Sequence, residues 1–174
     1  MNKKGIIIGA CCAAAVLLVV IIIALAAGGK SPKSVAKKLG PALQSEAKLE
    51  KFCEKNIDYK ALVALKKVMT MSYEDLSSSE KVAEAFKKQY KEASKDDVKE
   101  IKKDIKDSIK EYVVDKKLKL KECGDLEKED GDGMEDFQTM KVTYVDEDDK
   151  EYEYTLSFYK KKLVSFSPAS SFDL

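Results

Sequence analysis

The 174-residue chain contains neither histidine nor arginine. Histidine is the usual general base near neutral pH and the commonest metal ligand. Its absence excludes hydrolases built on a Ser-His or Cys-His pair and zinc enzymes with histidine ligands. Arginine supplies the planar fork that reads guanine, phosphate or carboxylate through two hydrogen bonds, which lysine cannot copy. A mechanism built on a carboxylate, lysine, tyrosine or cysteine survives these exclusions in principle. We nevertheless expect a chain that is not an enzyme, with no catalytic residue, no cofactor and no metal site.

All basic side chains are lysine, and the 32 lysines nearly balance 31 acidic residues, which leaves a formal net charge of +1. A domain that binds nucleic acid usually carries a strong positive excess. We therefore expect no nucleic-acid partner. Tryptophan is also absent, and this lysine-rich, tryptophan-free composition is typical of an AT-rich bacterial genome.

An uncharged run from Gly5 to Ala27 is the strongest feature of the chain, and only Lys3 and Lys4 carry charge before it. As a helix rising about 1.5 Å per residue, it would span roughly 35 Å, enough to cross a hydrocarbon core of about 30 Å. The run is longer than the 7 to 15 apolar residues that are usual in cleaved signals. We therefore expect a membrane anchor over residues 1–29, with a signal-anchor helix at 5–27.

Two other interpretations of the run stay open. Ala24-Leu25-Ala26 is an acceptable cleavage site, so the segment could be removed as a signal peptide. Ile8-Gly9-Ala10-Cys11 superficially resembles a lipobox with Cys11 as the lipidated residue, but only Gly5 to Ile8 would then precede it as apolar residues, which is too short.

The orientation of this anchor is a separate question, because lysines lie on both sides of it. Lys30, Lys33, Lys37 and Lys38 follow the run, so the positive-inside rule slightly favours a cytoplasmic domain. Long domains, however, are translocated largely regardless of charge. We expect a single-pass cell-membrane protein with an extracytoplasmic domain. Lys33, Lys37 and Lys38 are candidates for contacts with anionic headgroups, or are simply the solvated face of a helix.

The remaining residues, 30–174, are predicted to form one α+β domain, helical over 31–115 and a sheet over 117–167. Ser31 with Pro32, Ser77 with Glu80 and Ser94 with Asp97 are helix-start signals. Gly40-Pro41 predicts a kink or a restart. Beyond residue 116 apolar residues alternate with polar ones, as in strands with one solvated face. We expect several helices packed on one face of a four-stranded antiparallel meander.

This order of elements resembles the nuclear transport factor two-like (cystatin-like) domains, specifically the small anchored or lipoprotein-type bacterial ones of unknown function. The resemblance rests on the Ser31-Pro32 start after an apolar segment and on a closing hairpin in Tyr144–Asp148, Glu151–Phe158 and Leu163–Phe166. The chain differs in its longer helical region and in lacking tryptophan in the last strand. The resemblance implies a role in cell-envelope binding or scaffolding and carries over no catalytic residues.

A few residues are candidates for a site. Tyr144, Tyr152, Tyr154 and Phe158 could line a pocket in a concave sheet, although aromatic residues at strand spacing usually form core. The acidic segments at 127–136 and 146–151 lack the spacing of a calcium-binding loop and are typical of hairpin turns.

Cys53 and Cys123 could form a disulfide outside the cytoplasm, or remain two thiols. Strand alternation puts Cys123 on the lysine face, opposite Leu118 and Leu120, unless the strand ends or bulges near Gly124.

From the sequence we expect a membrane-anchored, non-enzymatic extracytoplasmic domain that binds or scaffolds an unknown protein or envelope component. A small-molecule binder or hydrolase that uses a cone-shaped pocket is one alternative. A cytoplasm-facing membrane adaptor is another.

Overall fold

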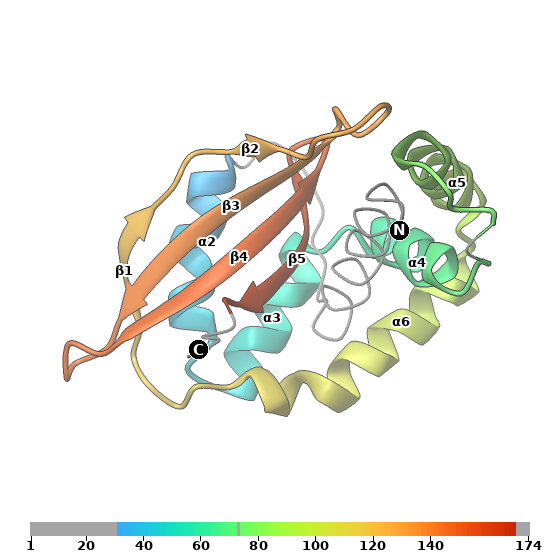
Figure 1. Ribbon diagram of the computed structural model, residues 1–174. Coiled ribbons are helices and arrows are strands. Elements are labelled where there is room, and N and C mark those ends of the chain that lie inside the picture. The colour runs from blue at the N-terminus through green and yellow to red at the C-terminus, as the bar shows by residue number, and fades with distance from the viewer. Residues whose placement is uncertain (1–30, 73, 170–174) are drawn as a thin grey trace, which may run out of the picture.

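The computed structural model describes residues 31–72 and 74–169 and has α+β architecture, as the sequence predicts (Figure 1). Helical elements come first and strands follow. The helices are α2 (Pro32–Ala42), α3 (Glu46–Asn56), α4 (Tyr59–Met69), α5 (Ser79–Glu92), α6 (Lys95–Ser108) and the short 3-10 helix η1 (Ile109–Tyr112). The strands are β1 (Lys119–Cys123), β2 (Glu127–Lys128), β3 (Phe137–Val145), β4 (Glu151–Tyr159) and β5 (Lys162–Pro168).

The strands form one antiparallel sheet in the order β1-β3-β4-β5, and the short β2 pairs with the same strand, β3, as β1 does. The β3–β4 pair is the longest and runs in unbroken register from Phe137 opposite Tyr159 to Val145 opposite Glu151. The antiparallel sheet is therefore as predicted. The two-residue β2 was not expected, because its sequence, Glu127-Lys128, has no apolar alternation.

The inner face of the sheet forms the core of the domain. Its strand residues at alternate positions are almost fully buried: Met140, Val142, Tyr144, Tyr154, Leu156, Phe158 and Phe166. They pack against the apolar side of α2 and α3, including Leu39, Leu43 and Leu49. In Figure 1, α2 lies across the back of the sheet and α3 lies beside it, near β5. The opposite face carries threonine, serine and charged residues, which is the one-sided pattern expected from the alternation.

The prediction that the helices cover one face of the sheet is only partly right, because α4, α5 and α6 lie mainly beyond the β5 side (Figure 1). Four strands about 4.8 Å apart give a sheet roughly 19 Å wide. Helices about 10 Å across then fit only two abreast. The surplus helices pack around the edge instead, where Phe86 of α5 meets the rings of Phe137 and Tyr159 with both centroids 4.9 Å away.

Capping residues in the sequence correctly predict where most of the helices begin. The Ser31 side chain caps α2 with proline in the first turn, and Ser94 with Asp97 forms a complete capping box on α6. The cap of α5 is Ser78, not the predicted Ser77: its Oγ accepts a hydrogen bond from the N–H of Lys81. Three serines in a row make this start ambiguous in sequence.

Gly40-Pro41 does not interrupt the first helix where predicted, since α2 continues through both residues to Ala42 and the next helix begins at Glu46. Proline this close to the helix end removes only one backbone hydrogen bond. Glycine at position 40 has a tertiary reason: a Cβ atom there would lie 2.6 Å from Cδ1 of Tyr144.

Within residues 31–72 and 74–169, no helix is both long enough and apolar enough to cross a membrane. The predicted signal-anchor segment at 5–27 lies outside the described residues, and so do Cys11 and the Ala24-Leu25-Ala26 site.

Candidate functional site

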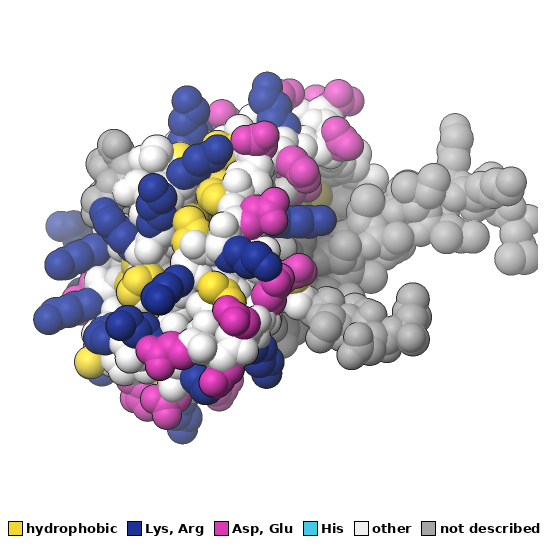
Figure 2. All heavy atoms as spheres, turned by 90° about the vertical axis from the view of Figure 1, so that its left-hand side faces the viewer, with side chains coloured by type: hydrophobic (Ala, Val, Ile, Leu, Met, Phe, Trp, Pro, Cys, Tyr) yellow, Lys and Arg dark blue, Asp and Glu magenta, His cyan; other side chains and the backbone are white. Residues whose placement is uncertain are grey.

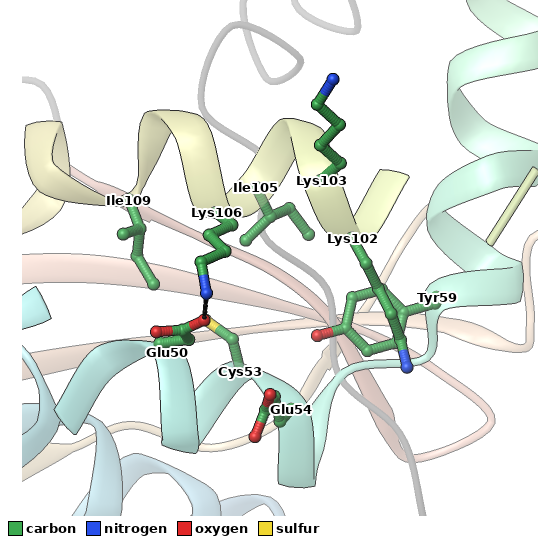
Figure 3. A pocket seen from close by; sticks show the side chains of 9 residues that line it. All are labelled: Glu50, Cys53, Glu54, Tyr59, Lys102, Lys103, Ile105, Lys106 and Ile109. Atoms are coloured by element: carbon green, nitrogen blue, oxygen red, sulfur yellow. Dashed lines mark ion pairs between the residues drawn. The ribbon is translucent and has the colours of Figure 1, made fainter. Parts of the chain in front are cut away.

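A surface pocket of about 270 Å³ opens between α3 and α6 (Figure 3). Apolar groups and a thiol, supplied by Cys53, Ile105 and Ile109, lie between the two helices. The charged residues around them come from both helices, and Tyr59 at the start of α4 closes one end. The lining residues are Glu50, Cys53, Glu54, Tyr59, Lys102, Lys103, Ile105, Lys106 and Ile109.

Helical spacing explains why each wall carries one sign of charge. Glu50 and Glu54 are four residues apart on α3 and so share one side, next to the buried Cys53. Lys102 and Lys106 have the same spacing on α6. Figure 3 shows Lys106 reaching down toward α3, whereas Lys103 points away from it. The pocket therefore has an acidic wall on α3 and a basic wall on α6.

Two of the lysines, Lys106 and Lys102, already contact other residues of the pocket. The Nζ atom of Lys106 lies 2.6 Å from Oε1 of Glu50, and this hydrogen bond raises the pKa of Lys106. The Nζ atom of Lys102 lies 4.8 Å from the centroid of the Tyr59 ring, within the range of a cation–π contact. An ion pair thus joins α6 to α3, and a cation–π contact joins α6 to the start of α4.

The nucleophiles in the pocket are held in their neutral forms. Burial is the main reason why the pKa of the Cys53 thiol is raised to about 12, and the nearby carboxylates of Glu50 and Glu54 add to it. Burial also raises the pKa of Tyr59. A reactive cysteine needs a lowered pKa, since the thiolate is the attacking species. The pocket therefore offers no activated nucleophile, and its volume is below the roughly 300 Å³ at which ordinary ligand sites begin.

The four aromatic residues predicted as pocket lining do not line this pocket. Tyr144, Tyr154 and Phe158 are fully buried in the core. The rings of Tyr144 and Tyr154 do come together, with centroids 5.8 Å apart, and the Tyr144 hydroxyl donates a hydrogen bond to the carbonyl oxygen of Ala36 at 2.7 Å. Tyr152 is half-buried, and its hydroxyl donates to Oδ2 of Asp146 at 3.0 Å. Three of the four side chains therefore belong to the hydrophobic core, and Tyr152 packs partly against it.

Cys53 and Cys123 are both free thiols, so the structure does not contain the disulfide considered from the sequence. The β1–β3 register shifts between Leu120 and Glu122, which makes a bulge at Lys121. This extra residue turns Cys123 back toward the inner face, where its Sγ lies 3.5 Å from Sδ of Met140. Simple alternation placed Cys123 on the lysine face, and the bulge reverses that assignment.

The acidic turn after β3 uses its first carboxylate to hold the backbone. Oδ1 of Asp146 accepts hydrogen bonds from the N–H groups of Asp148 and Lys150, at 2.9 and 3.0 Å. Burial opposes ionisation of Asp146, but these hydrogen bonds hold its pKa below the usual value. Among the described residues no three acidic, cysteine or histidine side chains cluster as metal ligands would.

The lysines predicted to meet headgroups lie on α2. Lys33, Lys37 and Lys38 are exposed, and Nζ of Lys33 lies 3.5 Å from Oδ1 of Asp125, just after β1. The three side chains are thus available on the surface beside the sheet edge.

The sequence did not single out the α3–α6 pocket. Its walls come from segments about 50 residues apart that are brought together only by the packing of the helices. The one local signal is the matched spacing of Glu50 with Glu54 and of Lys102 with Lys106, which is common in any charged helix.

No family model matches the chain, and no curated protein and no solved structure matches it either. The resemblance to nuclear transport factor two-like domains therefore stays a prediction.

Proposed function

We propose that the protein is a membrane-anchored, non-enzymatic domain that binds a protein or another envelope component on the outer side of the cell membrane. The anchor is inferred from the uncharged run at 5–27. The folded domain then presents its outer surface, and not an internal cavity, to its partner. We also propose that the domain is a variant of the nuclear transport factor two-like fold, which its helix-then-meander order supports.

The filled inner face of the sheet is the observation that carries this proposal. Tyr144, Tyr154 and Phe158 are buried on this face as part of the hydrophobic core. Among the described residues, every buried side-chain nitrogen and oxygen has a hydrogen-bond partner. A ligand site usually leaves a few convergent polar groups free to meet its ligand. The neutral thiol of Cys53 and the Lys106–Glu50 ion pair in the α3–α6 pocket also favour a non-enzymatic role.

Crosslinking in intact cells tests the proposal. The full chain, expressed at its natural level, would be treated with a membrane-impermeant lysine crosslinker, and its conjugates identified by mass spectrometry. We expect a defined partner joined through lysines of residues 31–169. A control chain in which residues 1–29 are replaced by an unrelated single-pass anchor should capture the same partner.

Two outcomes would contradict the proposal. A partner that is lost when the anchor is exchanged would show that the anchor, and not the domain, makes the contact. Capture only by a membrane-permeant crosslinker would place the domain in the cytoplasm and favour the adaptor alternative.

A further inference from the structure

Strand β1 has one free edge. It pairs with β3 on one side, and in the described part of the chain no strand pairs with its other side. Figure 1 shows β1 at the outer left of the sheet with α2 behind it. In an edge strand, alternate backbone N–H and C=O groups point away from the sheet and can pair with another chain.

Lysines from two elements flank this edge. Lys117 and Lys119 precede or begin β1 and are exposed, as is Lys37 on α2. Figure 2 views this side of the molecule: dark blue lysine side chains gather over its left half, magenta acidic side chains lie over its right and lower parts, and scattered yellow apolar groups lie between them. Partly buried apolar side chains on this edge include Leu120 and Cys123.

Lys33 and Lys37, one turn apart on α2, lie near the end of β1. Burial raises the pKa of the Cys123 thiol, and the positive charges of Lys33 and Lys37 oppose that rise. Lys33 also pairs with Asp125 immediately beyond the strand. The α2 lysines and the end of β1 therefore form one continuous surface.

This surface carries an excess of positive charge. Lys33 is paired with Asp125, and Lys121 with Glu151. The ion pairs formed among the described residues do not involve the other three lysines: Lys37, Lys117 and Lys119. Glu122 is the one acidic residue within β1. A partner that fits must bring negative charge.

We infer that the free edge of β1 binds an extended, acidic segment of a partner protein, which adds to the sheet as a further strand beside β1. The inference rests on the proposed function and names the partner's chemistry. Backbone hydrogen bonds to β1 would supply affinity, and acidic side chains facing Lys37, Lys117 and Lys119 would supply specificity.

An anionic membrane fits this surface less well than an acidic strand. Lipid headgroups have no row of alternating N–H and C=O groups to match those of a strand edge.

The test uses the full chain in nanodiscs of neutral phosphatidylcholine. The probe is a fluorescent, end-capped peptide of alternating glutamate and threonine, whose binding is followed by anisotropy. We expect saturable binding that weakens with added salt, because screening shortens to about 3 Å at 1 M. The same peptide with alternate backbone amides methylated cannot pair as a strand and should not bind. A peptide of alternating lysine and threonine should not bind either.

Paired variants locate the site. Lys37→Glu with Lys119→Glu should weaken binding by about tenfold or more, which corresponds to about 1.4 kcal/mol. Lys51→Glu with Lys88→Glu makes the same charge change on α3 and α5 and should alter affinity by less than about twofold. Circular dichroism would confirm that both variants are folded.

Several outcomes would overturn the inference. Equal binding of the methylated peptide would mean that charge alone acts. Binding of the chain to phosphatidylglycerol vesicles but not to the peptide would assign the lysines to the membrane. If the chain binds neither the peptide nor the vesicles, the lysines serve only to protect the free strand edge against edge-to-edge aggregation. If crosslinking captures a partner through other surfaces, the proposed function holds while this inference fails.

Discussion

At the scale of single residues, Gly40 belongs to α2 and also determines how closely α2 packs against Tyr144 in the core. A Cβ atom at residue 40 would lie 2.6 and 2.7 Å from Cδ1 and Cε1 of Tyr144. The Tyr144 ring is fully buried and its hydroxyl is bonded to Ala36, so it cannot move aside cheaply. Glycine lets α2 approach the sheet.

Gly40→Ala therefore tests this packing. In an exposed helix the change would stabilise by about 0.5 to 1 kcal/mol. Here we expect overpacking to lower the free energy of unfolding in urea by about 1 to 3 kcal/mol. Lys38→Ala on the exposed side of the same helix is the control and should change stability by less than about 0.5 kcal/mol. A stabilised Gly40→Ala variant would mean that the close approach is absent.

The two thiols of the described domain should differ in reactivity. Burial raises the pKa of Cys53 to about 12, whereas Cys123 is only partly buried. Alkylation with iodoacetamide at about pH 8 should modify Cys123 well before Cys53, since only the accessible thiolate reacts. Peptide mapping by mass spectrometry measures both rates. In guanidinium the two should react alike, and a Cys53–Cys123 disulfide in the untreated protein would contradict the prediction.

At the scale of elements, the start of α6 links stability to pH. Oδ2 of Asp97 accepts hydrogen bonds from the Ser94 hydroxyl and N–H at 2.7 and 2.8 Å and from Lys67 at 3.0 Å. These bonds, the hydroxyl first, lower the pKa of Asp97 to about 2. A lowered pKa stabilises the fold above the unfolded value of about 3.9, and the contribution is lost as the pH falls toward 2.

The free energy of unfolding should therefore drop between about pH 4 and pH 2, and the drop should be smaller in Asp97→Asn. Urea titrations at several pH values measure it. Parallel curves for the two proteins would contradict the role assigned to Asp97.

The β4–β5 hairpin has an unusual turn. Tyr159 pairs with Lys162, and both residues between them have positive φ angles, 50° at Lys160 and 62° at Lys161. Two-residue turns of this kind favour Asn-Gly. Replacing Lys160-Lys161 by Asn-Gly should stabilise the domain by about 1 kcal/mol, because the left-handed region costs roughly that for other residues.

Urea unfolding measures the gain from the Asn-Gly turn. Lys88→Gly in the middle of α5 is the control for adding glycine and should cost about 1 kcal/mol. A destabilised Asn-Gly variant would show that the lysine contacts at the turn outweigh its strain.

These elements also mark what the sequence could predict. Capping at Ser31 and Ser94, and strand alternation from Met140 to Phe158, are local patterns, and the structure follows them. The Lys160-Lys161 turn has no turn-forming residue in its sequence. Gly124 indicated that the first strand could end or bulge nearby, but it did not give the position of the bulge, which is Lys121. The α3–α6 pocket depends on packing between distant segments, which no local pattern encodes.

At the scale of the whole molecule, the order of elements places the free edge of β1 beside the start of α2. The chain enters the domain at α2 directly after the apolar run, with only residues 28–31 between them. Four residues span at most about 14 Å, so an anchored domain would stay close to the membrane. In an anchored chain, a partner that adds to β1 would thus be met near the membrane surface.

The last prediction concerns how the whole chain sits in the cell. We expect the full chain to remain in the membrane pellet after carbonate extraction, and residues 31–169 to be digested when intact cells, stripped of their wall, are treated with protease. The double variant Leu18→Lys with Val20→Lys should be released from the membrane pellet, because each charge at the centre of a spanning helix costs about 2.5 to 3.5 kcal/mol. Leu18→Ala with Val20→Ala is the matched control and should stay in the pellet. Digestion only after lysis would place the domain in the cytoplasm, and a mature chain that begins after Ala26 would show a cleaved signal instead of an anchor.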